Sequence, residues 1–261
     1  MAGAVGEVSH IHFSSPGDHI ALLEIDNPPM NALGRGPRAE LLARLDEIDA
    51  DKAFRAVVLT GRGRAFCSGD DLKEQAEANR AKSSTHFGEF GRVLERIETF
   101  RLPVIAAVNG HCLGGGLELA SVCDIRIAST AASFVCSGVN IGLMASAYRL
   151  PRLIGVARAK HMLLTGLPND AVAAERFGLV TAVHAPDALM GETIKLAERV
   201  ASRAPLSVEA VKRTASQAPD LSPAEAAELN AKELAVLSRS ADHREALAAF
   251  AAKREPIFRR E

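Results

Sequence analysis

Compact apolar runs alternate with amphipathic stretches through the first half of the chain. From this spacing we predict strands at 19–25, 56–60, 103–108 and 124–128, and helices at 38–48 and 93–100. The predicted strands are short, and those at 56–60 and 103–108 are nearly continuous apolar runs. We therefore expect a largely parallel sheet that is buried on both faces.

The pattern changes after residue 155, where Ala, Leu and Glu become frequent. Apolar positions at helical spacing predict helices at 157–164, 171–177, 188–202, 206–216, 223–238 and 243–253. The sequence therefore predicts an α/β fold with a C-terminal helical tail. We place the sheet-bearing core at residues 1–200 and the tail at 201–261.

Composition narrows the class of protein. With 261 residues, 48% of them hydrophobic, the chain can bury the core of one large domain. The net charge of -1 gives no general attraction to nucleic acid or to an anionic membrane. Neither a signal peptide nor a transmembrane run is apparent, which predicts a cytoplasmic protein.

Metal and redox motifs are also missing from the sequence. The 4 cysteines form no CxxC pair, so we expect reduced thiols and no metal site. His10 and His12 form an isolated HxH pair without further ligands, and we interpret them as solvated or packed histidines. No dinucleotide loop, GxxxxGK[ST] sequence or GxSxG elbow occurs.

The first segment that can carry chemistry covers residues 64–73, just after a predicted strand. Gly69 permits close approach of a ligand, so the backbone N–H of Asp70 can bind an oxygen atom. Asp and Gly also favour ordinary turns, and a simple turn is the alternative interpretation.

The second segment covers residues 109–118, where three consecutive glycines precede a predicted helix. A helix N-terminus presents unpaired N–H groups and a partial positive charge, so it can stabilise an oxyanion. Glu118 lies in the first turn of that helix. It is a candidate catalytic carboxylate, and the alternative is a residue that caps the helix.

Together with residues 25–33, these two segments resemble those of the crotonase family, also called the enoyl-CoA hydratase/isomerase superfamily. The resemblance implies a spiral of ββα units and an oxyanion hole made by the N–H groups of Asp70 and Gly115. Glu118 matches the first catalytic glutamate of the family. The carboxylate of Asp70 must then point away from the developing enolate or be neutralised.

The resemblance also implies a ligand and an assembly. It suggests contacts with coenzyme A from Ser68, Asp71, Leu72 and Lys73. Residues 250–258 look like the family's terminal motif, from which Lys253 reaches the ligand of a neighbouring subunit in a homotrimer or a dimer of trimers. Coenzyme A is part of the acyl-CoA substrate, so no separate cofactor is expected.

The segment after Phe134 departs from the family pattern, because Gly138 stands where typical hydratases carry a second glutamate. Our first prediction is an enoyl-CoA hydratase that adds water to a trans-2-enoyl-CoA in fatty acid or related metabolism. An isomerase, a lyase or a decarboxylase of the same superfamily is the alternative. A catalytically weak acyl-CoA-binding subunit is a third hypothesis.

Overall fold

The computed structural model describes residues 9–80 and 86–261. Its largest sheet has six strands in the order β1 (Ile11–Gly17), β2 (Ile20–Ile25), β4 (Ala56–Gly61), β7 (Val104–Val108), β9 (Ile125–Ser129) and β12 (Ala182–His184). All neighbours in this sheet are parallel except β1 and β2. The predicted parallel sheet is therefore confirmed.

Strand β1 corrects the sequence interpretation, which took 19–25 as the first strand. Most of β1 is exposed, because it lies at the sheet edge and carries the polar residues Ser14 and Ser15. An edge strand with one open face has no continuous apolar run, so its sequence resembles a loop.

Two smaller sheets were also missed because their strands are too short to show a period. One contains β11 (Asn169–Asp170), β10 (Ser133–Val135), β8 (His111–Leu113) and β5 (Ala65–Cys67), and the other pairs β3 (Ala32–Leu33) with β6 (Gly69–Asp70). Strand β8 runs parallel to β5, and β6 runs parallel to β3. These pairings position the two glycine-containing loops.

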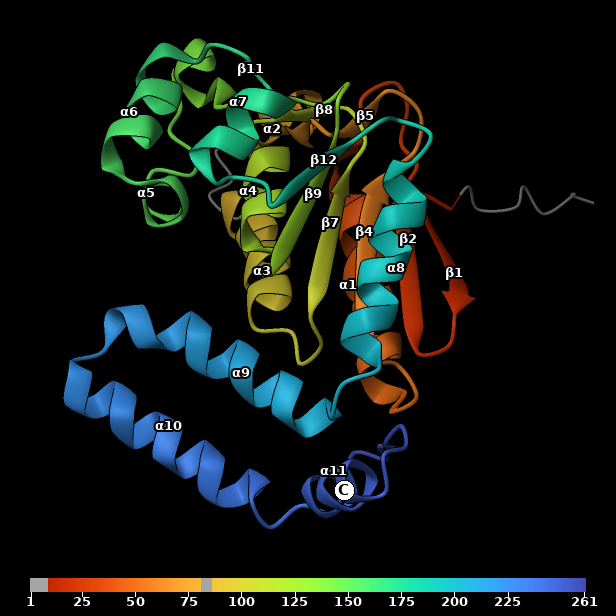
Figure 1. Cartoon of the computed structure of the whole chain (residues 1–261). Coiled ribbons are helices and arrows are strands. Elements are labelled where there is room, and N and C mark those ends of the chain that lie inside the picture. The colour runs from red at the N-terminus through yellow and green to blue at the C-terminus, as the bar shows by residue number, and fades with distance from the viewer. Residues whose placement is uncertain (1–8, 81–85) are drawn as a thin grey trace, which may run out of the picture.

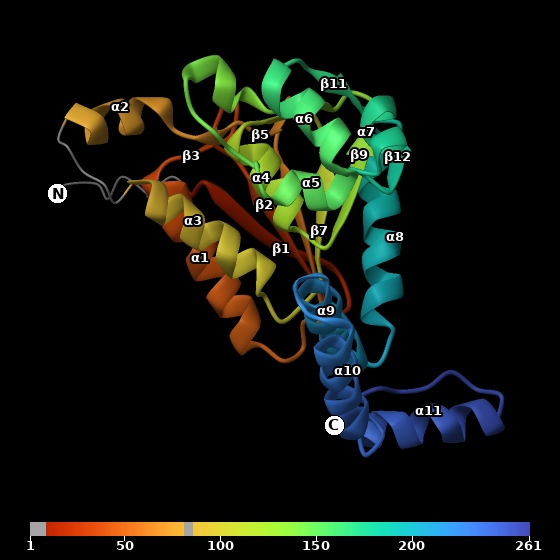
Figure 2. The same cartoon turned by 90° about the vertical axis from the view of Figure 1, so that its left-hand side faces the viewer.

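Helices cover both faces of the large sheet. Helices α1 (Arg35–Ala50), α3 (His86–Glu98) and α4 (Gly115–Val122) contribute to one core, and α8 (Leu189–Ala201) packs on the other face. Figure 2 shows α1 and α3 on one side of the strands and α8 on the other. Along β4, Val57 and Leu59 belong to the first core and Val58 to the second, which explains the unbroken apolar run.

Further helices surround the sheets. They are α2 (Leu72–Arg80), the 3-10 helix η1 (Ser137–Ile141), α5 (Arg149–Ile154), α6 (Val156–Thr165) and α7 (Ala171–Phe177). The six helices predicted after residue 155 agree with the structure to within two residues at either end, whereas η1 and α5 were not predicted. None of the helices in the described ranges is long and apolar enough to cross a membrane.

The tail contains α9 (Pro205–Gln217), the 3-10 helix η2 (Ala218–Asp220), α10 (Pro223–Leu237) and α11 (Ala241–Ala251). It lies at the end of the large sheet opposite α2 and β5 (Figure 1). A partly buried ion pair connects it to the body, with Lys212 Nζ 2.8 Å from Asp124 Oδ2. The predicted α/β fold with a helical tail is confirmed, and the exact division at residue 200 stays a prediction.

Candidate active site

The two glycine-containing loops are in direct contact. Gly69 begins β6 with φ at +89°, a conformation that favours glycine. A Cβ atom at this position would lie 2.5 Å from the backbone nitrogen of Gly115. Gly115 is the first residue of α4, so its N–H has no partner within the helix. The fold therefore places the Asp70 and Gly115 segments side by side.

A second close approach holds this contact in place. A Cβ atom at Gly116 would lie only 1.9 Å from the carbonyl oxygen of Cys67. Because the Cys67 carbonyl belongs to the backbone of β5 and Gly116 to the backbone of α4, neither can move aside easily, and this position excludes any side chain. The glycine run thus reflects packing between the loops as well as access for a ligand.

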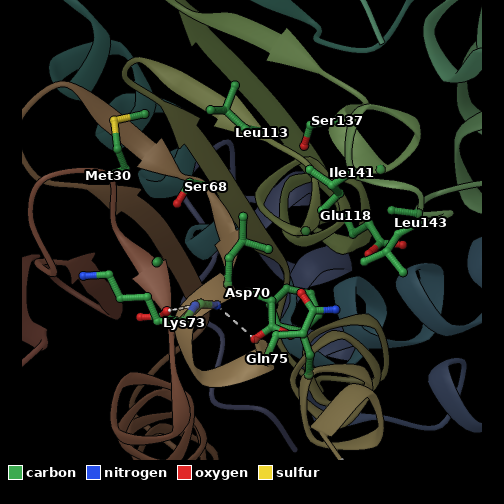
Figure 3. A pocket seen from close by; sticks show the side chains of 18 of the residues that line it. Met30, Ser68, Asp70, Lys73, Gln75, Leu113, Glu118, Ser137, Ile141 and Leu143 are labelled. Atoms are coloured by element: carbon green, nitrogen blue, oxygen red, sulfur yellow. Dashed lines mark hydrogen bonds between the residues drawn. The ribbon is translucent and has the colours of Figure 1, made fainter. Parts of the chain in front are cut away.

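The loops open on a cavity of about 720 Å³, a size usual for small-molecule sites. Much of its lining is apolar: Met30, Leu72, Phe90, Leu94, Leu113, Ile141, Leu143 and Met144. Figure 3 shows Ser68 and Lys73 on one side of the cavity and Glu118 and Leu143 on the other. A ligand in the cavity therefore lies between the first loop and the carboxylate.

Glu118 lies in the first turn of α4 and is half-buried. Its Oε1 accepts a hydrogen bond of 2.6 Å from the backbone N–H of Ser146. Burial raises the pKa of Glu118 above the ordinary value of 4.5, while the Ser146 N–H and the charge of Arg149 act in the opposite direction. The carboxylate thus contacts a distant loop, a role that helix capping does not explain, and a raised pKa suits a general base.

Gly138 lines the same cavity, at the position where the sequence lacks a second glutamate. A Cβ atom there would lie 3.0 Å from the carbonyl oxygen of Leu143 and 3.2 Å from the nitrogen of Ala145. The chain folds back at this point, with Leu143 N–H donating to the Gly138 carbonyl at 2.8 Å. The same loop brings Ser146, with φ at +57°, against Glu118. A side chain at Gly138 would therefore pack tightly against the loop that holds Glu118, and this loop would have to shift by a few tenths of an ångström to admit it.

Three residues that line the cavity in the described ranges carry a carboxylate: Asp70, Asp71 and Glu118. Asp70 Oδ1 accepts from Arg38 Nη1 at 2.5 Å, so this carboxylate is paired with a buried arginine. Asp71 Oδ1 accepts the N–H of Lys73 at 2.8 Å at the start of α2, which is a helix-capping contact. Glu118 is the one of the three whose carboxylate neither pairs with an arginine nor caps a helix.

The other predicted ligand contacts divide into two groups. Ser68, Leu72 and Lys73 belong to the first segment and line the cavity. Lys253 lies just after α11 in the tail and is not among the described residues that line this cavity. Its expected reach into a neighbouring subunit stays a prediction.

Two residues of the site were missed by the sequence analysis. Arg38 lies on the buried face of α1 together with Leu41 and Leu45. An arginine among apolar residues at helical spacing is unusual, and this feature of the sequence could have identified it. Ser146 gave no comparable signal, because its contact with Glu118 depends on the path of a loop.

The half-buried carboxylate of Glu118 shares one cavity with the Asp70 and Gly115 backbone segments, and this arrangement defines a site for a polarised carbonyl group. The profile of the enoyl-CoA hydratase/isomerase family matches residues 16–261. The (E)-benzylidenesuccinyl-CoA hydratase of Thauera aromatica is 38% identical over 248 residues, which cover 93% of this chain and 96% of that protein. The crotonyl-CoA hydratase of Syntrophomonas wolfei is 34% identical over 247 residues, which cover 92% and 95%.

Solved structures agree with this match. The crystal structure of an enoyl-CoA hydratase from Bacillus anthracis superposes with a TM-score of 0.94 at 32% identity, covering 97% of this chain and 100% of that chain. This chain belongs to the enoyl-CoA hydratase/isomerase family, and its predicted crotonase-like fold is confirmed.

Proposed function

We propose that the protein is an enoyl-CoA hydratase, which adds water across the double bond of a trans-2-enoyl-CoA. The observation that carries this proposal is the meeting of Glu118 with the Asp70 and Gly115 segments at one cavity. The names of the relatives from Thauera aromatica and Syntrophomonas wolfei, both hydratases of CoA thioesters, support it.

In the proposed reaction, the N–H groups of Asp70 and Gly115 bind the thioester oxygen. Glu118 takes a proton from a water molecule as the water oxygen bonds to the β-carbon, and the double bond moves to form an enolate. Glu118 then returns the proton to the α-carbon, which restores the thioester carbonyl. One carboxylate is sufficient for this sequence, so the lack of a second one at Gly138 is compatible with hydration.

Double-bond isomerisation is the second candidate, because the residues that line the cavity include the groups that this reaction needs. A base that moves a proton between the α- and γ-carbons needs one carboxylate and the same oxyanion pocket. Glu118 supplies that carboxylate, and Gly138, which lines the same cavity, adds no second one. The two reactions differ in product mass, which makes them easy to separate.

Ser68, Asp71, Leu72 and Lys73 are proposed contacts for coenzyme A, supported by their places along the cavity in the first segment. Coenzyme A enters as part of the substrate, and we propose no separate cofactor. The proposed location is the cytoplasm, because the four cysteines are free thiols, as is usual in a reducing compartment.

We also propose a homotrimer or a dimer of trimers assembled through the tail. Helix α10 has no buried residue in the single chain, although it is 15 residues long. Phe250 in α11 is 86% exposed, and Leu234, Leu247 and Ile257 are exposed as well. Large apolar side chains at such exposure are usual where subunits meet.

The proposal is tested by incubating the purified protein with trans-2-enoyl-CoAs of several chain lengths and resolving the products by mass. A gain of one water molecule supports hydration, and a product of unchanged mass with a shifted double bond supports isomerisation. Calorimetric binding of the same thioesters without any turnover would overturn both reactions and favour the binding subunit. Glu118→Gln, measured beside the wild type, shows whether turnover comes from this cavity.

A further inference from the structure

Arg38 is a buried arginine in the apolar stripe of α1. Its side chain is 3% exposed and lies on the helix face that carries Leu41 and Leu45. A charge in such a position is strongly unfavourable unless it is paired and hydrogen-bonded. The partners of Arg38 therefore indicate why an arginine occupies this position.

The guanidinium group of Arg38 contacts carboxylates from three elements around the cavity. Nη1 donates to Asp70 Oδ1 on β6 at 2.5 Å, and Nη2 donates to Glu89 Oε2 on α3 at 3.2 Å. Nη2 also lies 3.7 Å from Glu74 Oε2 on α2. Glu74 in turn accepts the N–H of Arg35, the first residue of α1, at 2.9 Å. Arg38 thus joins α1 to the segments on the Asp70 side of the cavity.

Asp70 occupies an electrostatically demanding position. Its backbone N–H is proposed to bind the oxygen on which the enolate charge develops, and its own carboxylate belongs to the same residue. An unpaired carboxylate so close to a second negative charge would disfavour the enolate. Arg38 neutralises it through a contact that is largely shielded from solvent and therefore weakly screened by salt.

We infer that Arg38 is a positioning residue of the oxyanion site. It offsets the charge of the Asp70 carboxylate and ties β6 to α1, which fixes the backbone of Asp70 at the cavity. Arg38 acts on the substrate indirectly, through its ion pair with Asp70. This inference rests on the proposed oxyanion pocket and adds to it a charge pair that lets an aspartate serve there.

The pair is tested with Arg38→Met and with the double variant Arg38→Met/Asp70→Asn. The probe is a 3-ketoacyl-CoA, whose enolate absorbs strongly in the near ultraviolet, so the bound enolate fraction can be measured without turnover. We expect Arg38→Met to lower the enolate-to-keto ratio of bound probe about 100-fold, and Asp70→Asn to restore at least about 10-fold in that background. Hydration kcat should follow the same order, with KM changed by no more than about 3-fold.

Arg44→Met is the matched control, since Arg44 lies on the same helix and pairs with the exposed Glu47 at 2.8 Å. It should leave the enolate ratio at the wild-type value. If Arg38→Met does not fold, Arg38→Lys with and without Asp70→Asn makes the same comparison while retaining a charge. The Lys single variant should lower the ratio because its ammonium lacks the planar fork, and Asp70→Asn should again raise it.

Three results would overturn the inference. The first is a wild-type enolate ratio in the Arg38 single variant, and the second is a lowered ratio that Asp70→Asn does not raise, as a purely structural arginine predicts. The third is a wild type that binds the probe without raising its enolate fraction, which removes the oxyanion pocket as well. A wild type that stabilises the enolate but hydrates no enoyl-CoA instead rejects the proposed reaction and leaves the role of Arg38 in place.

Discussion

Replacing Glu118 with glutamine isolates its charge from its geometry. The Ser146 N–H donates to Glu118 Oε1 at 2.6 Å, and the amide oxygen of glutamine can accept the same bond. The loop should therefore keep its place while the basic group is lost. General bases contribute about 100-fold or more, so we expect kcat to fall by at least that factor, equivalent to about 2.7 kcal/mol. Binding of the acyl-CoA should change by only a few-fold.

The same variant should change two pH dependences. Burial raises the pKa of Glu118 above 4.5, so the acid limb of the wild-type kcat/KM profile should lie above that value. A carboxyl group whose pKa is higher in the folded than in the unfolded protein contributes to the free energy of unfolding. This contribution is fully present at pH values below the unfolded-state pKa, where the group is protonated in both states. This contribution is lost as pH rises through the folded-state pKa. Glu118→Gln carries no such charge, so its Tm relative to wild type should increase with pH.

The assay combines stopped-time hydration kinetics with thermal melts of one preparation over a pH series. Glu95→Gln is the matched control, because Glu95 is an exposed residue of α3. It should leave the rate and both pH profiles unchanged. Turnover of Glu118→Gln within a few-fold of wild type would refute the single-base mechanism and direct attention to Asp70 or Asp71.

Three further predictions follow from particular contacts. Gly116→Ala places a Cβ atom 1.9 Å from the Cys67 carbonyl oxygen, so urea unfolding should show a loss of about 3 kcal/mol or more, or no folded protein. Gly191→Ala is its control, since that Cβ meets nothing within 4 Å in α8, and a stabilisation of about 0.5–1 kcal/mol is expected. Lys73→Ala should weaken coenzyme A binding at low ionic strength and flatten its salt dependence, and unchanged titration calorimetry would remove Lys73 from the site. Phe250→Asp should shift the sedimentation profile towards smaller species, whereas a wild type that is already a stable active monomer would contradict the trimer.

The sequence by itself determined the elements that carry a strong pattern of apolar residues. The central strands are buried on both faces, so their residues form unbroken apolar runs, and the tail helices show a clear helical period. The glycine positions of the two loops were also visible, because close backbone contacts at Gly69 and Gly116 admit no other residue. These features are local, or they restrict residue type directly.

Tertiary structure decided which charges and loops complete the site. The three-residue strands β5 and β8 are too short to show a period, yet their pairing brings Gly69 against Gly115. Arg38 and Asp70 are 32 positions apart, and Ser146 and Glu118 are 28 apart, so neither contact leaves a trace in local spacing. The ion pair of Asp70 and the hydrogen bond to Glu118 form between side chains and loops that only tertiary packing brings together. Electrostatic interactions depend on distance in space and not on separation along the chain.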